Sequence, residues 1–402
     1  MRSYEKIVYI GVLVFSVLFL IIGNRIAGGI AYNTEFEPTY YTSVVIRIAE
    51  RGENYDFGFT SSYIIFNARI TGGERRGDII TAEQMTNDFF VVTEREVSVG
   101  DRVLIAYDDF NSVYFFANYV RINYIAILGA LFLVIVILFG RTKGFNAIIA
   151  LGFTCLAVFW IFIPAILSGR NIFVTAIIIC VYSIVSTLLI VIGANKKSLC
   201  AILGCLGGVL LACLLMFLMD SVLGLTGVLD QETQSLLLLP LENPLNLRAL
   251  IFAGVIIGAV GAIMDVAMSI SSSLWELSLA GGVSDFNSIF KSGINIGKDI
   301  LGTMLNTLIL AYIGSSLSII LLITVHTNSV TELLNMEMII VEFLRALIGS
   351  LGMLLAIPLT AAVCGRLYAL PTEPEYEEED DDDEYFKRLQ ARKDARLRQR
   401  EF

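Results

Sequence analysis

The residues of this 402-residue chain that are best placed to do chemistry are polar side chains inside long apolar stretches. Asp265 lies near the middle of one such stretch, and Ser269, Ser272 and Glu276 follow it at i+4, i+7 and i+11. At helical spacing these four side chains lie on one side of a helix. A carboxylate at bilayer depth costs several kcal/mol unless it faces a protein interior, water or a charged partner. The spacing therefore predicts a functional site around Asp265.

A second apolar stretch carries a matching stripe, because Asp299, Thr303 and Asn306 follow one another at i, i+4 and i+7. Two helices with such stripes can together line a water-filled path or an ion site. Carboxylate, amide and hydroxyl oxygens are ligands that suit hard cations or protons. The alternative is that these groups only hydrogen-bond the two helices to each other. The candidate transport or ion site comprises Asp265, Ser269, Ser272, Glu276, Asp299, Thr303 and Asn306.

The remaining inventory argues against enzyme chemistry. His326 is the only histidine, and a lone histidine cannot build a zinc site. The six cysteines all fall in apolar runs, and Cys200 and Cys205 lack the close spacing of a metal or redox pair, which favours buried, inert thiols. An intramembrane enzyme is the least favoured class, because Asp265 lacks a second aspartate at the centre of another span. We expect no enzyme, no cofactor and no metal site.

The apolar stretches themselves have the length of membrane spans. Hydrophobic residues make up 56% of the chain and charged residues 16%, against about a quarter charged in an average soluble domain. A hydrocarbon core about 30 Å thick needs about 20 apolar helical residues. Eight runs meet this length: residues 7–23, 124–140, 145–167, 172–193, 199–219, 250–272, 300–325 and 339–364. The first run is interpreted as an uncleaved anchor rather than a signal peptide.

The basic residues between the runs predict an orientation, since lysine and arginine stay on the cytoplasmic side. With the N-terminus inside, the inner loops hold Arg141, Lys143, Lys196, Lys197, Lys291, Lys298 and Arg366. The outer loop over residues 220–246 has no lysine or arginine, and Arg170 is the single exception among the short outer loops. An even number of spans then places both termini in the cytoplasm.

The segment after the first run has a different composition. Residues 41–49, 63–70, 102–107 and 113–121 are rich in β-branched and aromatic residues, with glycine-containing turns between them. They predict a small antiparallel barrel or sandwich outside the cell. Its aromatic residues serve either as packing, which we favour, or as a ligand surface. The expected domains are an anchor (1–23), a β-rich extracytoplasmic domain (24–121), a seven-helix bundle (122–366) and a cytoplasmic tail (367–402).

The tail accounts for the net charge of −10. Ten acids lie within residues 373–384, and without them 28 bases stand against 28 acids. No charged surface outside the tail therefore points to nucleic acid as a partner. Residues 373–384 are expected to be disordered, and residues 385–402 form a basic helix that either lies on the inner leaflet or folds back on the acidic run.

Three local features complete the pattern. Residues 278–298 mix apolar and polar side chains on the cytoplasmic side, as in an interfacial helix or a gate. Glu342 and Arg345, at i and i+3, predict an ion pair at the outer end of the last span. A glycine cluster in the fifth span predicts close helix packing, at Gly204, Gly207 and Gly208.

Two long motifs carry a family resemblance. Residues 258–277 and 297–317 resemble the YibE/F family of bacterial multi-spanning membrane proteins, as do residues 69–78, 99–107 and 118–123 in the outer segment. The resemblance implies a multi-pass protein of the bacterial cell membrane, and the family has no settled biochemical activity. It does not extend to the tail.

The function that these observations favour is a transporter or permease component for a small cation, proton or other solute, with the two polar stripes lining the path. The alternative is a non-transporting scaffold or accessory protein whose outer domain binds an envelope or secreted partner. The expected partners are the lipid bilayer and, beyond it, a second copy of the chain or an envelope protein.

Overall fold

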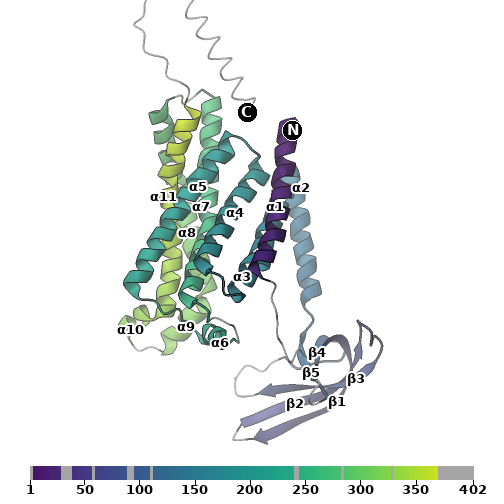
Figure 1. Ribbon diagram of the computed structural model, residues 1–402. Helices are drawn as coiled ribbons and strands as arrows, with labels where there is room; N and C mark the ends of the chain where they lie inside the picture. The colour runs from purple at the N-terminus through teal and green to yellow at the C-terminus, as the bar shows by residue number, and fades with distance from the viewer. Residues whose placement is uncertain are drawn as a thin grey trace, which may run out of the picture. The chain divides into compact units, whose positions relative to one another are not determined.

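The computed structural model describes residues 3–28, 39–56, 59–87, 95–108, 112–239, 244–281, 285–326 and 329–369. The predictions for the tail, residues 373–402, lie outside this part of the chain. The chain divides into two compact units, one over Ala31–Phe139 and one formed by Met1–Ile30 with Gly140–Phe402. The first contains the β-strands and the second contains a bundle of helices, and each is described by itself (Figure 1).

The β-strands close into a five-stranded barrel with the order β1-β2-β3-β5-β4. The first strand pairs with β2 on one side and β4 on the other, both antiparallel, whereas β3 and β5 run parallel over a short stretch. The predicted small β domain is confirmed, with one parallel pair in an otherwise antiparallel barrel. The strands are β1 (Thr39–Asp56), β2 (Phe59–Ile70), β3 (Ile79–Asn87), β4 (Arg102–Asp108) and β5 (Val113–Tyr119).

Alternating side chains of these strands fill the barrel, because successive residues of a strand point to opposite faces. The core holds Val45, Ile64, Phe66, Val103 and Ile105, each at most 2% exposed. The long strand β1 has two register shifts, which bend it as barrel closure requires. Of the aromatic residues in this segment, Tyr41, Tyr114, Phe116 and Tyr119 pack against the core, whereas Tyr40 and Phe115 are exposed.

The third strand was not predicted, and its sequence explains why. Residues 79–87 are largely polar, and Gln84 points inward with 1% of its surface exposed. Both ends of its amide are hydrogen-bonded, because Nε2 donates to the Arg95 carbonyl at 3.0 Å and Oε1 accepts from the Val97 N–H at 2.9 Å. A buried glutamine, hydrogen-bonded to the backbone, takes the place of an apolar residue. The alternation of apolar and polar residues that identifies a strand is therefore missing from this part of the sequence.

The other unit is helical, and the helices begin and end where polar caps and loops interrupt the apolar runs. The helices are α1 (Ser3–Ala27), α2 (Ile122–Ala157), the π-helical turn η1 (Val158–Phe162), α3 (Ile163–Leu167), α4 (Ile172–Ile192), α5 (Lys196–Leu223), α6 (Gln231–Leu237), α7 (Leu247–Leu279), α8 (Phe286–Ser315), α9 (Leu317–His326), α10 (Val330–Asn335) and α11 (Glu337–Tyr368). The first half of α2 belongs to the barrel unit and the second half to the helical unit.

Within the described residues, seven helical stretches are long and apolar enough to cross a membrane, against eight predicted spans. Two predicted spans, residues 124–140 and 145–167, fall in a single stretch of 46 residues, Ile122–Leu167. Arg141, at φ 48° and ψ −126°, interrupts the helical backbone inside it. The predicted span over residues 300–325 begins earlier, at Phe286, and its helix ends at Ser315. Residues 286–298, part of the segment predicted as an interfacial helix or a gate, are therefore the first turns of a long helix.

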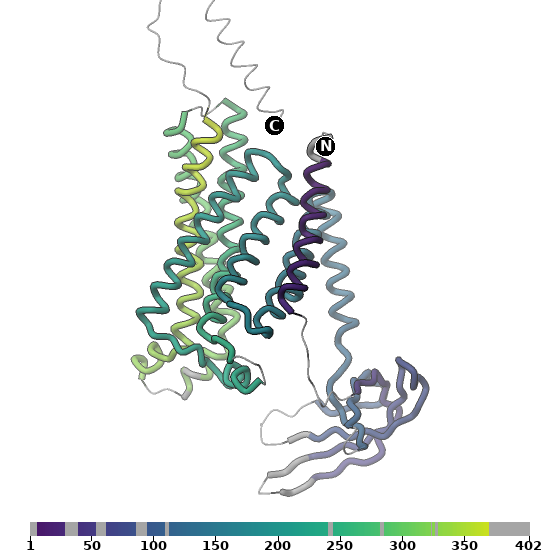
Figure 2. The backbone as a smooth tube through the Cα atoms, viewed as in Figure 1, coloured from purple at the N-terminus to yellow at the C-terminus, as the bar shows by residue number. Residues whose placement is uncertain are grey.

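Helix α7 lies at the centre of the bundle, in contact with α4, α5, α8 and α11 (Figure 2). Close approach depends on glycines, as predicted for the fifth span. A Cβ at Gly208 of α5 would lie 2.8 Å from Ala356 Cβ of α11 and 2.9 Å from a methyl carbon of Ile263 of α7. Gly293 of α8 meets Ala361 of α11 in the same way. On the other side of α7, α4 contacts α1, η1 and α3.

Candidate functional site

The stripe around Asp265 lies on the outer face of α7. Asp265 and Glu276 are exposed, and Ser269 and Ser272 are half-buried. The buried face of the same helix is apolar, with Ile263, Val266, Ala267 and Ile270 all fully buried. The four predicted residues therefore share a side of the helix, as the spacing requires, and that side does not face the interior of the single chain.

Small residues extend this stripe along α7. Gly254, Gly258 and Gly261 precede Asp265 at i−11, i−7 and i−4, so they lie on the same side. A Cβ placed at Gly254 or Gly261 would have no described atom within 4 Å. At Gly258 the nearest atom is the Tyr312 hydroxyl of α8, at 3.0 Å. The result is a narrow face of backbone, open at Gly254 and Gly261 and bordered by Tyr312 at Gly258, that leads from the beginning of α7 to a carboxylate near its middle.

The stripe on α8 is also exposed. Asp299, Thr303 and Asn306 face away from the bundle, and a Cβ at Gly302 beside them would have no described atom within 4 Å. The Thr303 hydroxyl donates to the carbonyl of Ile300 at 3.0 Å, so it is satisfied by its own helix. The opposite side of α8 packs on α11 through Gly293 and Gly297, both buried.

The two stripes are not brought together within one chain. The helices run antiparallel and touch where Tyr312 covers Gly258 and where Leu274 meets Gly293, so Asp265 lies at about the level of Thr303. Thr303 is nine residues from Tyr312, which at 3.6 residues per turn places it on the opposite side of α8. The sequence could tell which residues share a face of each helix, but not which face packs.

A second polar cluster lies where α7, α8 and α11 meet. The predicted ion pair is confirmed, because Arg345 Nη1 donates to Glu342 Oε1 at 2.7 Å. Glu342 Oε2 and Arg345 Nε are buried and have no hydrogen-bond partner among the described residues. Tyr312 lies close enough to both charged side chains to interact with them electrostatically. Tyr312 was missed as a candidate, and only its place inside the longer motif could have drawn attention to it.

A third polar cluster, at the opposite end of the bundle, is structural. Ser271 of α7, Tyr368 of α11 and the carbonyl of Lys197 in α5 are joined by hydrogen bonds in a buried setting. Two of the cysteines, Cys200 and Cys364, are buried beside Tyr368. All six cysteines are free. The expectation of buried thiols is wrong for Cys155, which is exposed, and holds only in part for Cys213, which is half-buried. Among the described residues, no group of three or more histidine, cysteine, aspartate or glutamate side chains could hold a metal ion.

Comparison with known proteins adds one finding to this geometry. A family model described as YibE/F-like protein matches residues 128–370, which is more than half of the chain and includes both polar stripes. The curated proteins and the solved structures gave no match.

Proposed function

The chain belongs to the YibE/F-like protein family, and on that premise we propose that it is a membrane transporter or permease component for a small ion or solute. The protein takes no part in a chemical reaction under this proposal. Its polar side chains would interact with a solute as the solute crosses the hydrocarbon core of the membrane, which has no polar groups. The path runs along the exposed faces of α7 and α8.

The exposure of Asp265 carries the proposal. The residue lies near the middle of a 33-residue helix that is a candidate span, and its side chain does not point into the bundle. A carboxylate in contact with lipid at this depth would cost several kcal/mol, so it faces either water or another protein surface. The open backbone at Gly254 and Gly261 leaves room beside Asp265 for a hydrated solute or for the close approach of a second helix.

The chemistry of the two faces favours a cation or proton. The exposed groups are the carboxylates of Asp265 and Asp299, the amide of Asn306 and the hydroxyl of Thr303, which together offer oxygen ligands. Since both faces are open in a single copy, the path needs a protein cover. A second copy of the chain related by a two-fold axis is the simplest source of one, because each copy would then present the same faces to the other.

The proposed topology has eight crossings. A helix of 46 residues would be about 69 Å long, more than twice a hydrocarbon core of about 30 Å, which favours two crossings by Ile122–Leu167 with a break at Arg141. In the helical unit, the beginning of α1 and the end of α11 lie at the same end (Figure 1). That placement supports a topology with both termini on one side, which the distribution of basic residues assigns to the cytoplasm of a bacterial cell.

The test is flux across liposomes that contain the purified full-length protein. Proton and cation fluxes would be measured with the native chain, with Asp265→Asn and with Asp220→Asn, a matched loss of a carboxylate near the end of α5 outside both stripes. The proposal expects flux in the native protein and in Asp220→Asn and a loss of at least tenfold in Asp265→Asn, since about 1.4 kcal/mol corresponds to a factor of ten. Native flux that Asp265→Asn leaves intact contradicts the role of Asp265.

A second candidate function is favoured by the barrel. It is a closed structure with its own apolar core and forms its own compact unit, so it has the build of a domain that can bind an envelope or secreted partner. In that case the membrane helices form a scaffold. Experiment distinguishes the two functions. A scaffold produces no ion flux in liposomes, and its Asp265→Asn variant still binds the partner.

A further inference from the structure

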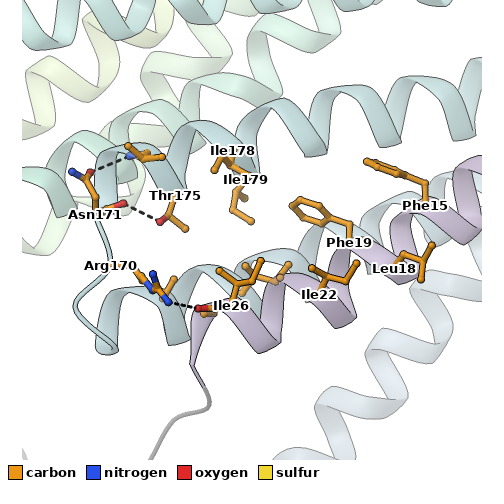
Figure 3. A pocket seen from close by; sticks show the side chains of 15 residues that line it. Phe15, Leu18, Phe19, Ile22, Ile26, Arg170, Asn171, Thr175, Ile178 and Ile179 are labelled. Carbon is orange, nitrogen blue, oxygen red and sulfur yellow. Dashed lines mark hydrogen bonds between the residues drawn. The ribbon is translucent and has the colours of Figure 1, made fainter.

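A cavity of about 640 Å³ lies between α1 and α4, with η1 and α3 on its inner side. Its walls are apolar along most of their length, and the side chains of Phe19, Ile22, Ile26, Ile178 and Ile179 point into the space between the two helices (Figure 3). None of the residues proposed for the transport path lines it. The cavity therefore calls for an explanation of its own.

One end of the cavity is polar, and this end coincides with the ends of three helices. There α1 ends at Ala27, α3 ends at Leu167 and α4 begins at Ile172. Arg170, Asn171 and Thr175 line this end (Figure 3). In membrane proteins, the boundary between the hydrocarbon core and the lipid headgroups is typically where helices end, loops begin and cationic side chains lie.

One hydrogen bond holds the Arg170 side chain at this boundary, and most of its N–H groups are not used by that bond. Its Nη2 donates to the carbonyl of Ile26 at 3.0 Å, and Ser168 Oγ donates to the carbonyl of Ala27, so the loop satisfies the last carbonyls of α1. A guanidinium has five N–H groups, and this bond uses one. The Arg170 side chain is exposed, and its other four donors have no hydrogen-bond partner among the described residues.

The length of the cavity matches one leaflet. Along α1 its lining runs from Phe15 to Ala27, which at 1.5 Å per residue is about 18 Å. Half of a hydrocarbon core of about 30 Å is about 15 Å. An apolar cavity does not hold ordered water, because water needs polar partners. Acyl chains are the apolar molecules that a bilayer supplies at this depth.

We propose that this cavity is a binding site for an anionic phospholipid, with one acyl chain between α1 and α4 and the headgroup phosphate on Arg170. The guanidinium donates to phosphate oxygens in the two-pronged geometry that arginine favours. Asn171 and Thr175 already serve the first turn of α4, where Asn171 Oδ1 accepts from the Val174 N–H and Thr175 Oγ1 donates to the Asn171 carbonyl. The selectivity for charge therefore rests on Arg170.

The test uses full-length protein and two lipids with the same acyl chains, phosphatidylglycerol and phosphatidylcholine, titrated into detergent-purified protein and followed by native mass spectrometry. Four variants dissect the site. Arg170→Gln removes the charge, Arg170→Lys keeps it, Ile178→Trp fills the middle of the cavity, and Arg248→Gln is the matched control. Arg248 is exposed in the first turn of α7. This turn lies at the same end of the bundle as Arg170, since Ala249 and Ala253 pack with Ile172 and Ala176 at the beginning of α4.

The native protein and Arg248→Gln are expected to prefer phosphatidylglycerol by about tenfold, the effect of one charge-assisted contact. Arg170→Gln removes this preference and Arg170→Lys keeps most of it, whereas Ile178→Trp lowers the binding of both lipids. Glycerol phosphate, which has no acyl chain, does not compete.

Equal retention of the two lipids by the native protein, or equal behaviour of Arg170→Gln and Arg248→Gln, overturns the proposal. Lipid binding that survives Ile178→Trp unchanged places the lipid elsewhere, and competition by glycerol phosphate reduces the site to a phosphate site. A second copy of the chain in the cavity would appear as a dimer that Ile178→Trp dissociates without any change in lipid binding. If Arg170→Gln fails to fold, the comparison of Arg170→Lys, Ile178→Trp and the control decides the question.

Discussion

The Oγ of Ser271 in α7 lies 2.8 Å from the hydroxyl of Tyr368 at the end of α11, in a fully buried setting. Ser271 Oγ also donates to the carbonyl of Lys197 in α5 at 2.7 Å. Three helices far apart in the sequence are thus joined through two hydroxyl groups. The ring of Tyr368 packs edge-on against Trp275 with centroids 5.1 Å apart, so the contact has an apolar part as well.

Two substitutions of Tyr368 should separate the contribution of its hydroxyl group from that of its ring. Tyr368→Phe keeps the ring and loses the hydroxyl, and we expect a loss of about 1 kcal/mol in the free energy of unfolding, the net value of a typical hydrogen bond. Tyr368→Ala also removes the buried ring and should cost about 3–5 kcal/mol. Unfolding in mild detergent measures both, and Tyr124→Phe, at an exposed position, is the control. Equal stability of Tyr368→Phe and the native chain would mean that the hydroxyl contributes nothing.

Two helical glycines should respond in opposite ways to the same substitution. Gly208→Ala places a Cβ within 3 Å of Ala356 and Ile263, and such overpacking costs about 1–3 kcal/mol. Gly254→Ala meets no atom and should gain up to about 1 kcal/mol, because alanine favours a helix over glycine. The midpoints of thermal unfolding test the pair. A loss of stability in Gly254→Ala would indicate that another protein surface already covers this face in the purified protein.

The ion pair in α11 should show coupling between its partners. The side chains of Arg345 and Glu342 are 29% and 18% exposed, so loss of one partner leaves the other partly buried and unpaired. We expect Arg345→Gln to cost about 1–3 kcal/mol, below the cost of breaking a fully buried pair. The double variant Glu342→Gln/Arg345→Gln should lose less than the sum of the single variants. Additive losses in unfolding experiments would contradict an interaction between the two charges.

The beginning of α8 should make stability depend on pH. Hydrogen bonds from Ser288, through its hydroxyl and its backbone N–H, hold the pKa of the Asp285 carboxyl below its ordinary value. A lowered folded-state pKa contributes stability above the unfolded pKa of about 3.9, and this contribution is lost as the pH falls through the folded pKa. Between pH 7 and pH 3 the native protein should lose more stability than Asp285→Asn, which does not titrate. Parallel stability profiles for the two proteins would disprove this role for Asp285.

The sequence predicted the features that depend on residue type and spacing along one element. The apolar runs, the β domain, the i, i+3 ion pair and the shared faces of the two stripes all follow from local periodicity. The sequence did not reveal which side of a helix packs against the other helices. On α8 the glycines Gly293 and Gly297 decide which side meets α11, and that choice sends Asn306 to the outside.

The start of α8 was misjudged for a related reason. Lys291 and Lys298 suggested a cytoplasmic loop, yet both are exposed on the outer side of a continuous helix, where their charge does not disturb the packing of Gly293 and Gly297. The cavity beside α1 depends on side chains from three separate helices, and no pattern within one run could have predicted it.

The connection between the barrel and α2 has a mechanical consequence. The last strand ends at Tyr119 and α2 begins at Ile122, so only Val120 and Arg121 separate the sheet from a helix of the membrane type. Force applied to the barrel therefore passes to the beginning of that helix almost without slack. Within α2 the backbone departs from helical geometry at Arg141, so we expect such a load to bend the helix there first.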